Sequence, residues 1–317
     1  MKPSLYLAEP EDFSEKALQK LSDHFEVHFA KTPTPSPSQL LHQFDVIWFR
    51  LGLRWDSAIL KSISQSRCRI FVTPVTSPDH IDETETKRLG ISVLSLRGEV
   101  DFLRSIRATA EHTLSLALTL LRKTNAAIND VRMGKWDRDS FRGTEISGKT
   151  VGIVGVGRLG LQVAELFKAF GAKVLGFDQD STSFASFIER RALLPLLGEA
   201  DLVSLHLSLN DSTRNFFGSN EFAAMKQRSY FINTSRSQIV DESALLKALQ
   251  EGRLAGAALD VLSGEPQISA SHPLVRYAQN NHHLLITPHI GGNTYESFEK
   301  TELFMAQKLI EHRPVAS

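Results

Sequence analysis

Charged and histidine side chains stand just after several predicted strands in the second half of the chain. Arg236 follows one such strand, Asp260 and Glu265 follow the next, and His289 follows a third. Arginine binds anions and histidine exchanges protons near neutral pH. One charged residue at a strand end is usually a solvated loop residue. Several at the same edge of a parallel sheet indicate a functional site, because such sheets bind ligands outside the carboxyl ends of their strands.

The fold that must position these residues is indicated by a strand, a glycine-rich turn and a helix in succession. A predicted buried strand, residues 149–154, leads into Gly155-Val156-Gly157-Arg158-Leu159-Gly160, and an amphipathic helix follows as far as Gly171. The three glycines suit a tight turn, close approach of the backbone to a pyrophosphate, and close packing of helix on sheet. Arg158 and Leu159 open the helix, whose free N–H groups can bind phosphate.

A second predicted strand, residues 173–177, ends on Asp178. A carboxylate at this place accepts hydrogen bonds from the hydroxyls of an adenosine ribose. The same charge repels a 2′-phosphate, and Gln179-Asp180-Ser181 offers no cation to bind one. The pattern therefore predicts NAD rather than NADP as the cofactor.

Short apolar runs alternate with helical patterns along the chain, which predicts an α/β fold of two domains. Six runs from residue 149 to residue 287 predict a doubly wound six-stranded parallel sheet for the NAD-binding domain. Five earlier runs, at residues 4–8, 25–30, 46–49, 70–73 and 91–96, predict a parallel sheet for the other domain. A helix over residues 109–123 is expected to lead from one to the other.

Composition excludes several classes of protein. The 317 residues carry 36 basic and 36 acidic side chains, so no net charge favours nucleic acid or a membrane surface. Cys68 is the only cysteine, which rules out an intrachain disulfide and suits a reducing compartment. The first residues enter a strand pattern rather than a signal peptide, and no apolar run reaches the roughly 20 residues that span a bilayer. We expect a cytoplasmic protein.

From about Glu111 to Gly292 the chain resembles the D-isomer-specific 2-hydroxyacid dehydrogenase family. The resemblance rests on the glycine turn and on four further segments in the family's order, residues 225–249, 256–261, 265–266 and 287–290. It implies NAD-dependent interconversion of a 2-keto acid and a D-2-hydroxy acid. It also implies a flavodoxin-like substrate domain of residues 1–110 plus 293–317 and a dinucleotide-binding domain of residues 111–292.

By this resemblance Arg236, Glu265 and His289 match the family's catalytic residues. Reduction of a 2-keto acid needs a hydride on the carbonyl carbon and a proton on its oxygen, and His289 can donate that proton. Glu265 would orient the ring and favour its charged form, and Arg236 would bind the substrate carboxylate. Asp260 matches the residue that binds the nicotinamide carboxamide.

Further residues are expected to contact ligands. His206 and Thr234 follow strands of the second sheet and are expected beside the cofactor. In the first domain Ser77 lies in the loop that holds the substrate carboxylate in relatives. The arginines expected near the substrate are Arg50, Arg97, Arg104 and Arg107.

Two positions depart from the family pattern. Ser237 follows Arg236 where the family usually has glycine. Pro78 lies in the loop whose backbone N–H groups bind the substrate carboxylate in relatives, and proline has no N–H to donate. A cationic side chain is the natural substitute, so we expect a substrate larger and more polar than pyruvate.

Other readings remain open. A corepressor-like protein that senses NADH on the same scaffold is the main alternative, and a turnover assay separates it from an enzyme. Formate dehydrogenase is disfavoured, because that branch resembles a Gln–His rather than a Glu–His pair. We expect a homodimer, no metal site, and a cleft that closes about hinges near residues 111–114 and 288–293.

Overall fold

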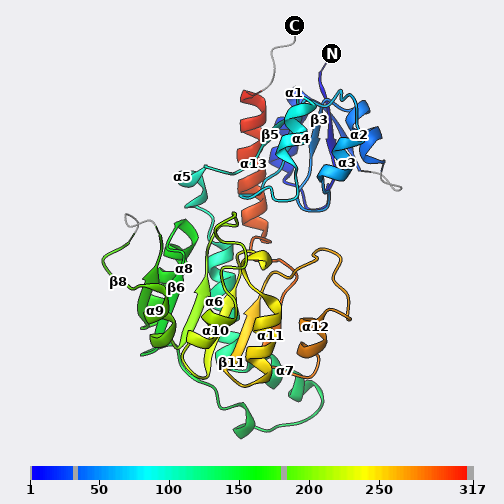
Figure 1. The fold of residues 1–317 in the computed structure, drawn as a ribbon. Coiled ribbons are helices and arrows are strands. Elements are labelled where there is room, and N and C mark those ends of the chain that lie inside the picture. Colours follow the sequence, from blue (N-terminus) through cyan, green and yellow to red (C-terminus); the bar gives the residue numbers. More distant parts are fainter. Residues whose placement is uncertain (1, 31–34, 180–183, 313–317) are drawn as a thin grey trace. The chain divides into compact units, whose positions relative to one another are not determined.

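The computed structural model describes residues 2–30, 35–179 and 184–312 and divides into two compact units (Figure 1). Unit 1 consists of Met1–Ile106 with Thr294–Ser317, and unit 2 consists of Arg107–Asn293. Asp180 and Ser181, which entered the cofactor prediction, lie outside the described residues.

Unit 1 contains a five-stranded parallel sheet in the order β2-β1-β3-β4-β5, which is the flavodoxin-like order. Its strands are β1 (Ser4–Leu7), β2 (Glu26–Phe29), β3 (Val46–Trp48), β4 (Ile70–Val72) and β5 (Ser92–Leu94). Its helices are α1 (Glu15–His24), α2 (Pro37–Gln43), α3 (Ser57–Lys61), α4 (Glu83–Arg88), α5 (Val100–Leu103) and α13 (Tyr295–Glu311). The five strands predicted for this part are confirmed.

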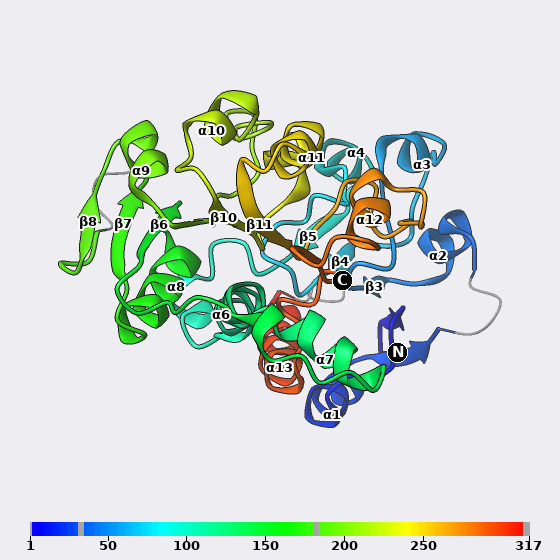
Figure 2. The same cartoon turned by 90° about the horizontal axis from the view of Figure 1, so that it is seen from below.

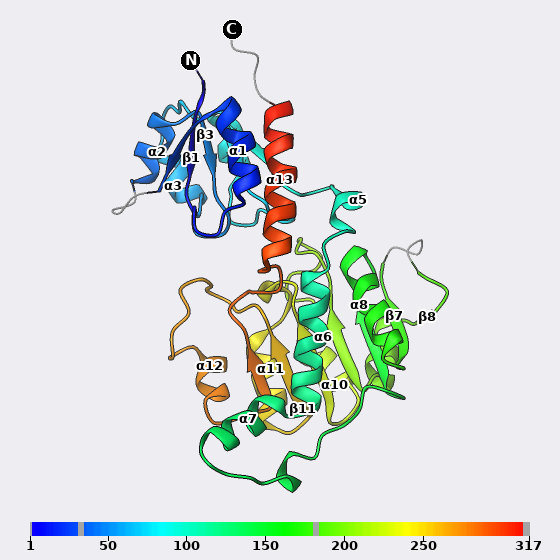
Figure 3. The ribbon, with the colours of Figure 1, turned by 180° about the vertical axis from the view of Figure 1, so that it is seen from behind.

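Local sequence explains where these helices begin. The side chain of Ser14 accepts a hydrogen bond from the Ala17 amide at the start of α1, and Asp82 caps α4 in the same way. Helices α1 and α13 cover one face of the sheet through buried leucines such as Leu21 and Leu309. Figure 3 shows these two helices side by side.

Unit 2 contains a seven-stranded sheet in the order β12-β11-β10-β9-β6-β7-β8, in which every pairing is parallel. Its strands are β6 (Thr150–Val154), β7 (Lys173–Phe177), β8 (Ile188–Arg190), β9 (Leu202–Leu205), β10 (Ser229–Asn233), β11 (Leu254–Leu259) and β12 (Leu284–Ile286). Figure 2 shows the strands following one another across the sheet from β8 to β11.

The helices of unit 2 lie on both faces of its sheet. They are α6 (Ala108–Leu121), α7 (Thr124–Arg132), α8 (Arg158–Ala169), α9 (Leu193–Glu199), α10 (Ser219–Ala224), α11 (Glu242–Gln250) and α12 (Pro273–Ala278), with short 3₁₀ turns η1 (Asp139–Phe141) and η2 (Ser237–Ile239). One core joins the sheet to α6 and α8, and a second joins it to α9, α10, α11 and α12. Neighbouring strand residues such as Phe231 and Ile232 face opposite cores, as the period of two requires.

The doubly wound sheet is confirmed, but its strand number was predicted wrongly as six. Strand β8 adds a seventh at the edge beside β7. Only Ile188 of its three residues is buried, while Glu189 and Arg190 are exposed. An edge strand of this kind has no apolar run for a sequence pattern to detect.

Cys68 is buried in unit 1 and forms no disulfide. No helix in the described part of the chain is both long and apolar enough to cross a membrane.

Candidate active site

The strands of unit 2 end together at one edge of the sheet. Their register pairs the last residue of each central strand with the last residue of its neighbour. The residues that come next along the chain therefore start at this edge, and they are Gly155, His206, Thr234, Asp260 and Thr287. Four of these five had been predicted as site residues from the sequence.

The glycine turn after β6 leaves no room for other residues at two of its positions. A Cβ atom on Gly155, whose φ is +93°, would lie 2.6 Å from the carbonyl oxygen of His206. A Cβ atom on Gly160 would lie 1.9 Å from the carbonyl oxygen of Gly155. Gly157 differs, since a Cβ atom there would meet no described atom within 4 Å.

This arrangement fits a bound pyrophosphate. Gly157 is the N-cap of α8, and no side chain caps that helix end by a hydrogen bond. The first N–H groups of a helix have no acceptor within the helix, so they can donate to phosphate oxygens beside the open Gly157. Arg158 begins the helix, where burial lowers the pKa of its guanidinium below the ordinary value.

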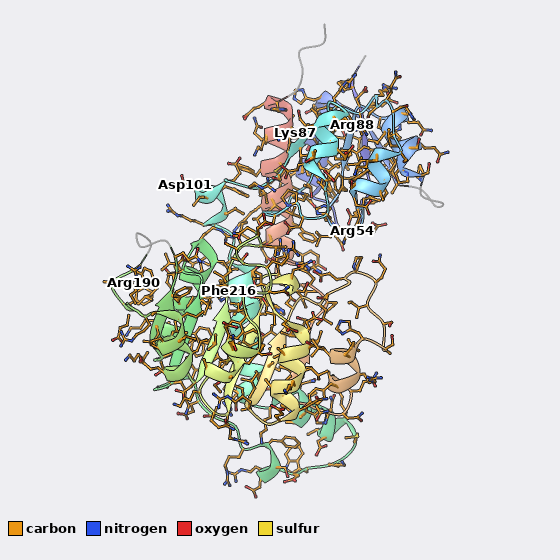
Figure 4. The ribbon with its side chains drawn as sticks, in the orientation of Figure 1. Arg54, Lys87, Arg88, Asp101, Arg190 and Phe216 are labelled. Carbon is orange, nitrogen blue, oxygen red and sulfur yellow. The ribbon has the colours of Figure 1, made fainter. Side chains whose placement is uncertain are left out.

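Asp178 follows β7, and its Oδ2 accepts a hydrogen bond of 2.6 Å from the Val156 amide in the glycine turn. It lines a hollow of about 430 Å³ together with Phe177, Arg190, Arg191 and Ala192. Figure 4 shows Arg190 beside β8, and its guanidinium lies 5.4 Å from the centre of the Phe184 ring. Arg191 pairs with Glu189 and Glu199. Sequence reasoning missed both arginines because they come from β8 and its end.

Arg236 follows β10 and lies immediately before η2. The side chain of Asn233 fixes this turn, since its amide donates to the Arg236 carbonyl and its Oδ1 accepts the Ser235 amide. Ser237 is 2% exposed and does not adopt a left-handed φ, so the turn accepts serine at this position without backbone strain.

Glu265 and His289 form a direct pair. The distance from Glu265 Oε1 to His289 Nδ1 is 3.1 Å, and each side chain is 29% exposed. With Nδ1 facing the carboxylate, Nε2 is the ring atom that can exchange a proton with a ligand. His289 has a left-handed φ of 55°, and its amide donates to the carbonyl oxygens of Asp260 and Thr287.

Asp260 is 1% exposed and accepts hydrogen bonds from several directions. Its Oδ1 accepts from the Thr287 hydroxyl at 2.5 Å and from the Ile290 amide at 2.9 Å, and its Oδ2 accepts from the Gly291 amide at 2.7 Å. The His112 ring lies 3.2 Å from Oδ1. Burial alone raises the pKa of Asp260, but these hydrogen bonds outweigh it and hold the pKa below its ordinary value.

His206 and Thr234 lie at the same edge in buried surroundings. Burial lowers the pKa of His206 to about 3, so its ring stays neutral at ordinary pH. Its Nε2 lies 2.8 Å from the Ser204 hydroxyl. The Thr234 hydroxyl lies 2.9 Å from that of Thr113 in α6.

The arginines predicted near the substrate are all paired with carboxylates. Arg50 binds Glu302 at 2.5 Å, and Arg97 binds Glu83 at 2.8 Å, both within unit 1. In unit 2 Arg107 binds Glu165 at 3.0 Å, and in unit 1 Arg104 binds Asp101 at 3.0 Å. A second anionic group on the substrate would have to replace one of these partners.

The loop after β4 holds Ser77, which is partly buried, and Pro78, which is buried. The Pro78 carbonyl accepts the Ile81 amide at 3.0 Å. Among the described residues, no three His, Cys, Asp or Glu side chains lie together as a metal site requires.

Comparison with known proteins agrees with this geometry. The family model described as "D-isomer specific 2-hydroxyacid dehydrogenase, NAD binding domain" matches residues 114–291. A glyoxylate reductase from Aeropyrum pernix is 35% identical over 93% of this chain and 89% of its own length.

Solved structures share the whole fold. A D-lactate dehydrogenase from Aquifex aeolicus, solved with NAD and lactic acid, has a TM-score of 0.83 and 25% identity, covering 98% of this chain and 95% of that one. An acyclic imino acid reductase solved with NADPH and D-Arg has a TM-score of 0.82 and 26% identity over 98% of this chain and 96% of that one.

The matched segment covers more than half of the chain and contains the glycine turn, Asp178 and the Glu265–His289 pair. The chain belongs to the D-isomer-specific 2-hydroxyacid dehydrogenase family, and its residues 114–291 form the NAD-binding domain of that family.

Proposed function

We propose that this enzyme reduces a 2-keto acid to a D-2-hydroxy acid, with His289 as acid and base, Glu265 as its orienting partner and Arg236 as the group that binds the substrate carboxylate. The contact of 3.1 Å between Glu265 and His289 carries the proposal. The pair follows strands that end at the same edge of the sheet as the glycine turn, which supports a role for His289 as proton donor. Unit 2 is the dinucleotide-binding domain in this proposal, and unit 1 supplies further substrate contacts.

His289 and Glu265 have different roles in the proton transfer. NADH, when bound, would supply the hydride for the carbonyl carbon of the substrate. His289 in its imidazolium form gives a proton from Nε2 to the carbonyl oxygen, while Glu265 at Nδ1 stabilises the charged ring before transfer. In the reverse direction the neutral ring takes the proton from the hydroxyl group.

Arg236 provides the positive charge for the substrate. A guanidinium group binds a carboxylate through two parallel hydrogen bonds, which fixes the plane of the keto acid relative to the proton donor. The turn held by Asn233 keeps the Arg236 backbone in place for this task.

NAD is the preferred cofactor in this proposal. The carboxylate of Asp178 suits the two ribose hydroxyls of NAD and repels the 2′-phosphate of NADP. Arg190 and Arg191 line the same hollow and can attract a phosphate, but Arg191 is already paired with two carboxylates. Solved proteins of this fold hold NADPH in one case and NAD in another.

The substrate in this proposal is an anionic 2-keto acid, and two observations bear on its size. The relative from Aeropyrum pernix is named for glyoxylate, a small acid. Pro78 removes a backbone donor for the carboxylate, which supports a larger substrate with a second polar group. Arg97 is the candidate partner for that group, because 57% of its side chain stays exposed beside Glu83.

A panel of 2-keto acids tests the function and the substrate together. It should include glyoxylate, pyruvate, hydroxypyruvate and a phosphorylated keto acid, each followed by loss of NADH absorbance. Reduction of at least one acid to the D-enantiomer is expected. NADH binding without turnover of any acid would instead favour a corepressor-like protein that senses NADH. A highest kcat/KM with pyruvate or glyoxylate would contradict the larger substrate.

We also propose that the enzyme is a homodimer formed through unit 2. The support is a short stretch in and after α7 with four exposed apolar side chains. They are Ile128, Val131, Met133 and Trp136, the last of them 88% exposed. Monomeric proteins seldom leave clustered apolar side chains in water.

A further inference from the structure

His112 in α6 contacts Thr287, in the loop that carries His289, and Asp260, which binds that loop. Its Nε2 lies 3.0 Å from Thr287 Oγ1 and 3.2 Å from Asp260 Oδ1. The ring is largely buried, with 17% of the side chain exposed, and Asp260 has 2% of its side chain exposed. The residue has no part in the proton transfer proposed above, and the resemblance assigned it no role.

The hydrogen-bond pattern fixes the direction of each bond. The Thr287 hydroxyl donates its only hydrogen to Asp260 Oδ1 at 2.5 Å. The threonine oxygen can then only accept a further hydrogen, so Nε2 of His112 carries the proton and donates. His112 thus supplies a further N–H beside Thr287 Oγ1 and Asp260 Oδ1.

Asp260 in turn holds the chain on both sides of His289. The His289 amide donates to the Asp260 carbonyl at 2.9 Å, and the next two amides, of Ile290 and Gly291, donate to its two carboxylate oxygens. A non-glycine residue keeps a left-handed φ, 55° at His289, only when its neighbours hold it there. The carboxylate provides that restraint.

The two carboxylate oxygens of Asp260 differ in the number of protein donors beside them. Oδ1 accepts hydrogen bonds from the Thr287 hydroxyl and the Ile290 amide and lies 3.2 Å from the His112 ring. Among the described donors, only the Gly291 amide donates to Oδ2. An ionised carboxylate has about four acceptor sites in all, and with one described donor Oδ2 can also accept from a ligand amide. The contact of His112 with Oδ1 leaves Oδ2 on the opposite side of this cluster of donors available.

The same cluster joins the two ends of unit 2. The chain enters this unit at Arg107 and leaves it at Asn293. His112 lies in the first turns of α6 after the entry, and Ile290 and Gly291 lie directly before the exit. One buried carboxylate therefore connects both segments through which the chain passes between the units.

We infer that His112 is a positioning residue: through Asp260 it holds the 287–291 loop so that the His289 ring stays beside Glu265. The inference rests on the proposed function, because it is His289 whose placement matters. It assigns a task to Asp260 besides any contact with the cofactor.

Amide hydrogen exchange measures the proposed restraint without requiring turnover. In His112→Leu the donor is lost, and the amides of Ile290 and Gly291 should exchange at least about tenfold faster than in the wild type, the effect expected for one hydrogen bond to a charged group. His112→Gln can place an amide N–H where Nε2 lies, and it should restore most of the protection. His282→Leu, an exposed histidine just before β12, is the matched control and should leave both amides unchanged.

Kinetics then test the link to His289. For His112→Leu we expect kcat to fall roughly tenfold or more while the Kd for NADH changes less than about threefold, with recovery in His112→Gln. Thr287→Val removes the hydroxyl that donates to Asp260 Oδ1 and should change amide exchange and kcat in the same direction. It provides a second test if His112→Leu does not fold.

Three results separate the possible failures. Unchanged exchange at Ile290 and Gly291 in both His112→Leu and Thr287→Val would overturn the inference. Faster exchange with an unchanged kcat would also overturn it, since the loop would then be held for no catalytic purpose. A wild-type enzyme that reduces no 2-keto acid would remove the proposed function, and the exchange data would still decide whether His112 holds the loop.

Discussion

Glu265 and His289 carry out the proton transfer in the proposed reaction, and their geometry allows a specific test. Their side chains are equally exposed, at 29%, so the pair is neither fully buried nor freely solvated. A carboxylate at 3.1 Å from Nδ1 favours the imidazolium form that ketone reduction needs. The charge of Glu265, rather than its shape, is therefore expected to set the pH range of the reaction.

Glu265→Gln keeps the shape of the side chain and removes its charge. The imidazolium of His289 then loses a stabilising partner. The decline of ketone reduction toward alkaline pH should therefore begin at a lower pH than in the wild type. The measurement is the pH profile of kcat in the direction of ketone reduction.

His272 provides a matched control. Its Nε2 lies 3.3 Å from Glu242, with side chains 16% and 17% exposed, so it belongs to a similar pair that takes no part in the proposed site. His272→Gln should leave the pH profile in place. A profile that does not move in Glu265→Gln would refute the coupling between Glu265 and His289.

At the scale of elements, the ends of β7 and β8 are expected to set the choice between NAD and NADP. Asp178, directly after β7, would repel a 2′-phosphate, while Arg190 at the end of β8 lines the same hollow and would attract one. In the native chain the carboxylate is expected to dominate, because it also accepts the Val156 amide of the turn and so has a fixed place.

Asp178→Asn should increase kcat/KM for NADPH relative to NADH by roughly tenfold, since it removes one repulsive charge at close range. Asparagine retains an oxygen for the Val156 amide, so the turn should persist. Adding Arg190→Ala should reverse much of that gain. The native preference for NADH is measured in the same assay, and equal kcat/KM with NADPH in the wild type would contradict it.

The sequence predicted most elements of this fold for clear physical reasons. Central parallel strands are buried on both faces and appear as apolar runs, and Gly155 and Gly160 of the turn lie too close to backbone atoms for any other residue. Strand β8 was not predicted, because an edge strand with one buried residue gives no such run. Arg190 and Arg191 were missed as neighbours of Asp178 for the same reason.

Side-chain partners were the least predictable part. His112 is 148 positions before Asp260 in the sequence, and nothing in the pattern of α6 separates it from other polar residues of that helix. The pairing of Arg50 with Glu302 could not be foreseen either, because α13 joins unit 1 only after the whole of unit 2.

At the scale of the whole molecule the main prediction concerns assembly. Trp136 and Val131 expose 88% and 53% of their surfaces in the segment that includes α7 (Figure 3). A partner that covers them removes this apolar surface from water. Light scattering should give the mass of a dimer for the wild type.

The double substitution Val131→Asp with Trp136→Asp should yield a monomer, because two charges in an apolar interface are costly to desolvate. Leu194→Asp is the control, since Leu194 is 58% exposed on α9 and lies outside the proposed interface. It should remain a dimer. A monomeric wild type, or a double variant that stays dimeric, would contradict the proposed assembly.

The central claim is that His289 transfers the proton in a 2-keto acid reduction, and one comparison tests it most directly. The turnover of wild type and His289→Gln is measured with the best acid of the panel, and NADH binding is measured on the same samples. The account predicts a fall in kcat of roughly a hundredfold to ten-thousandfold with a Kd for NADH within about threefold of the wild type. A His289→Gln enzyme whose kcat stays within about threefold of the wild type would contradict it.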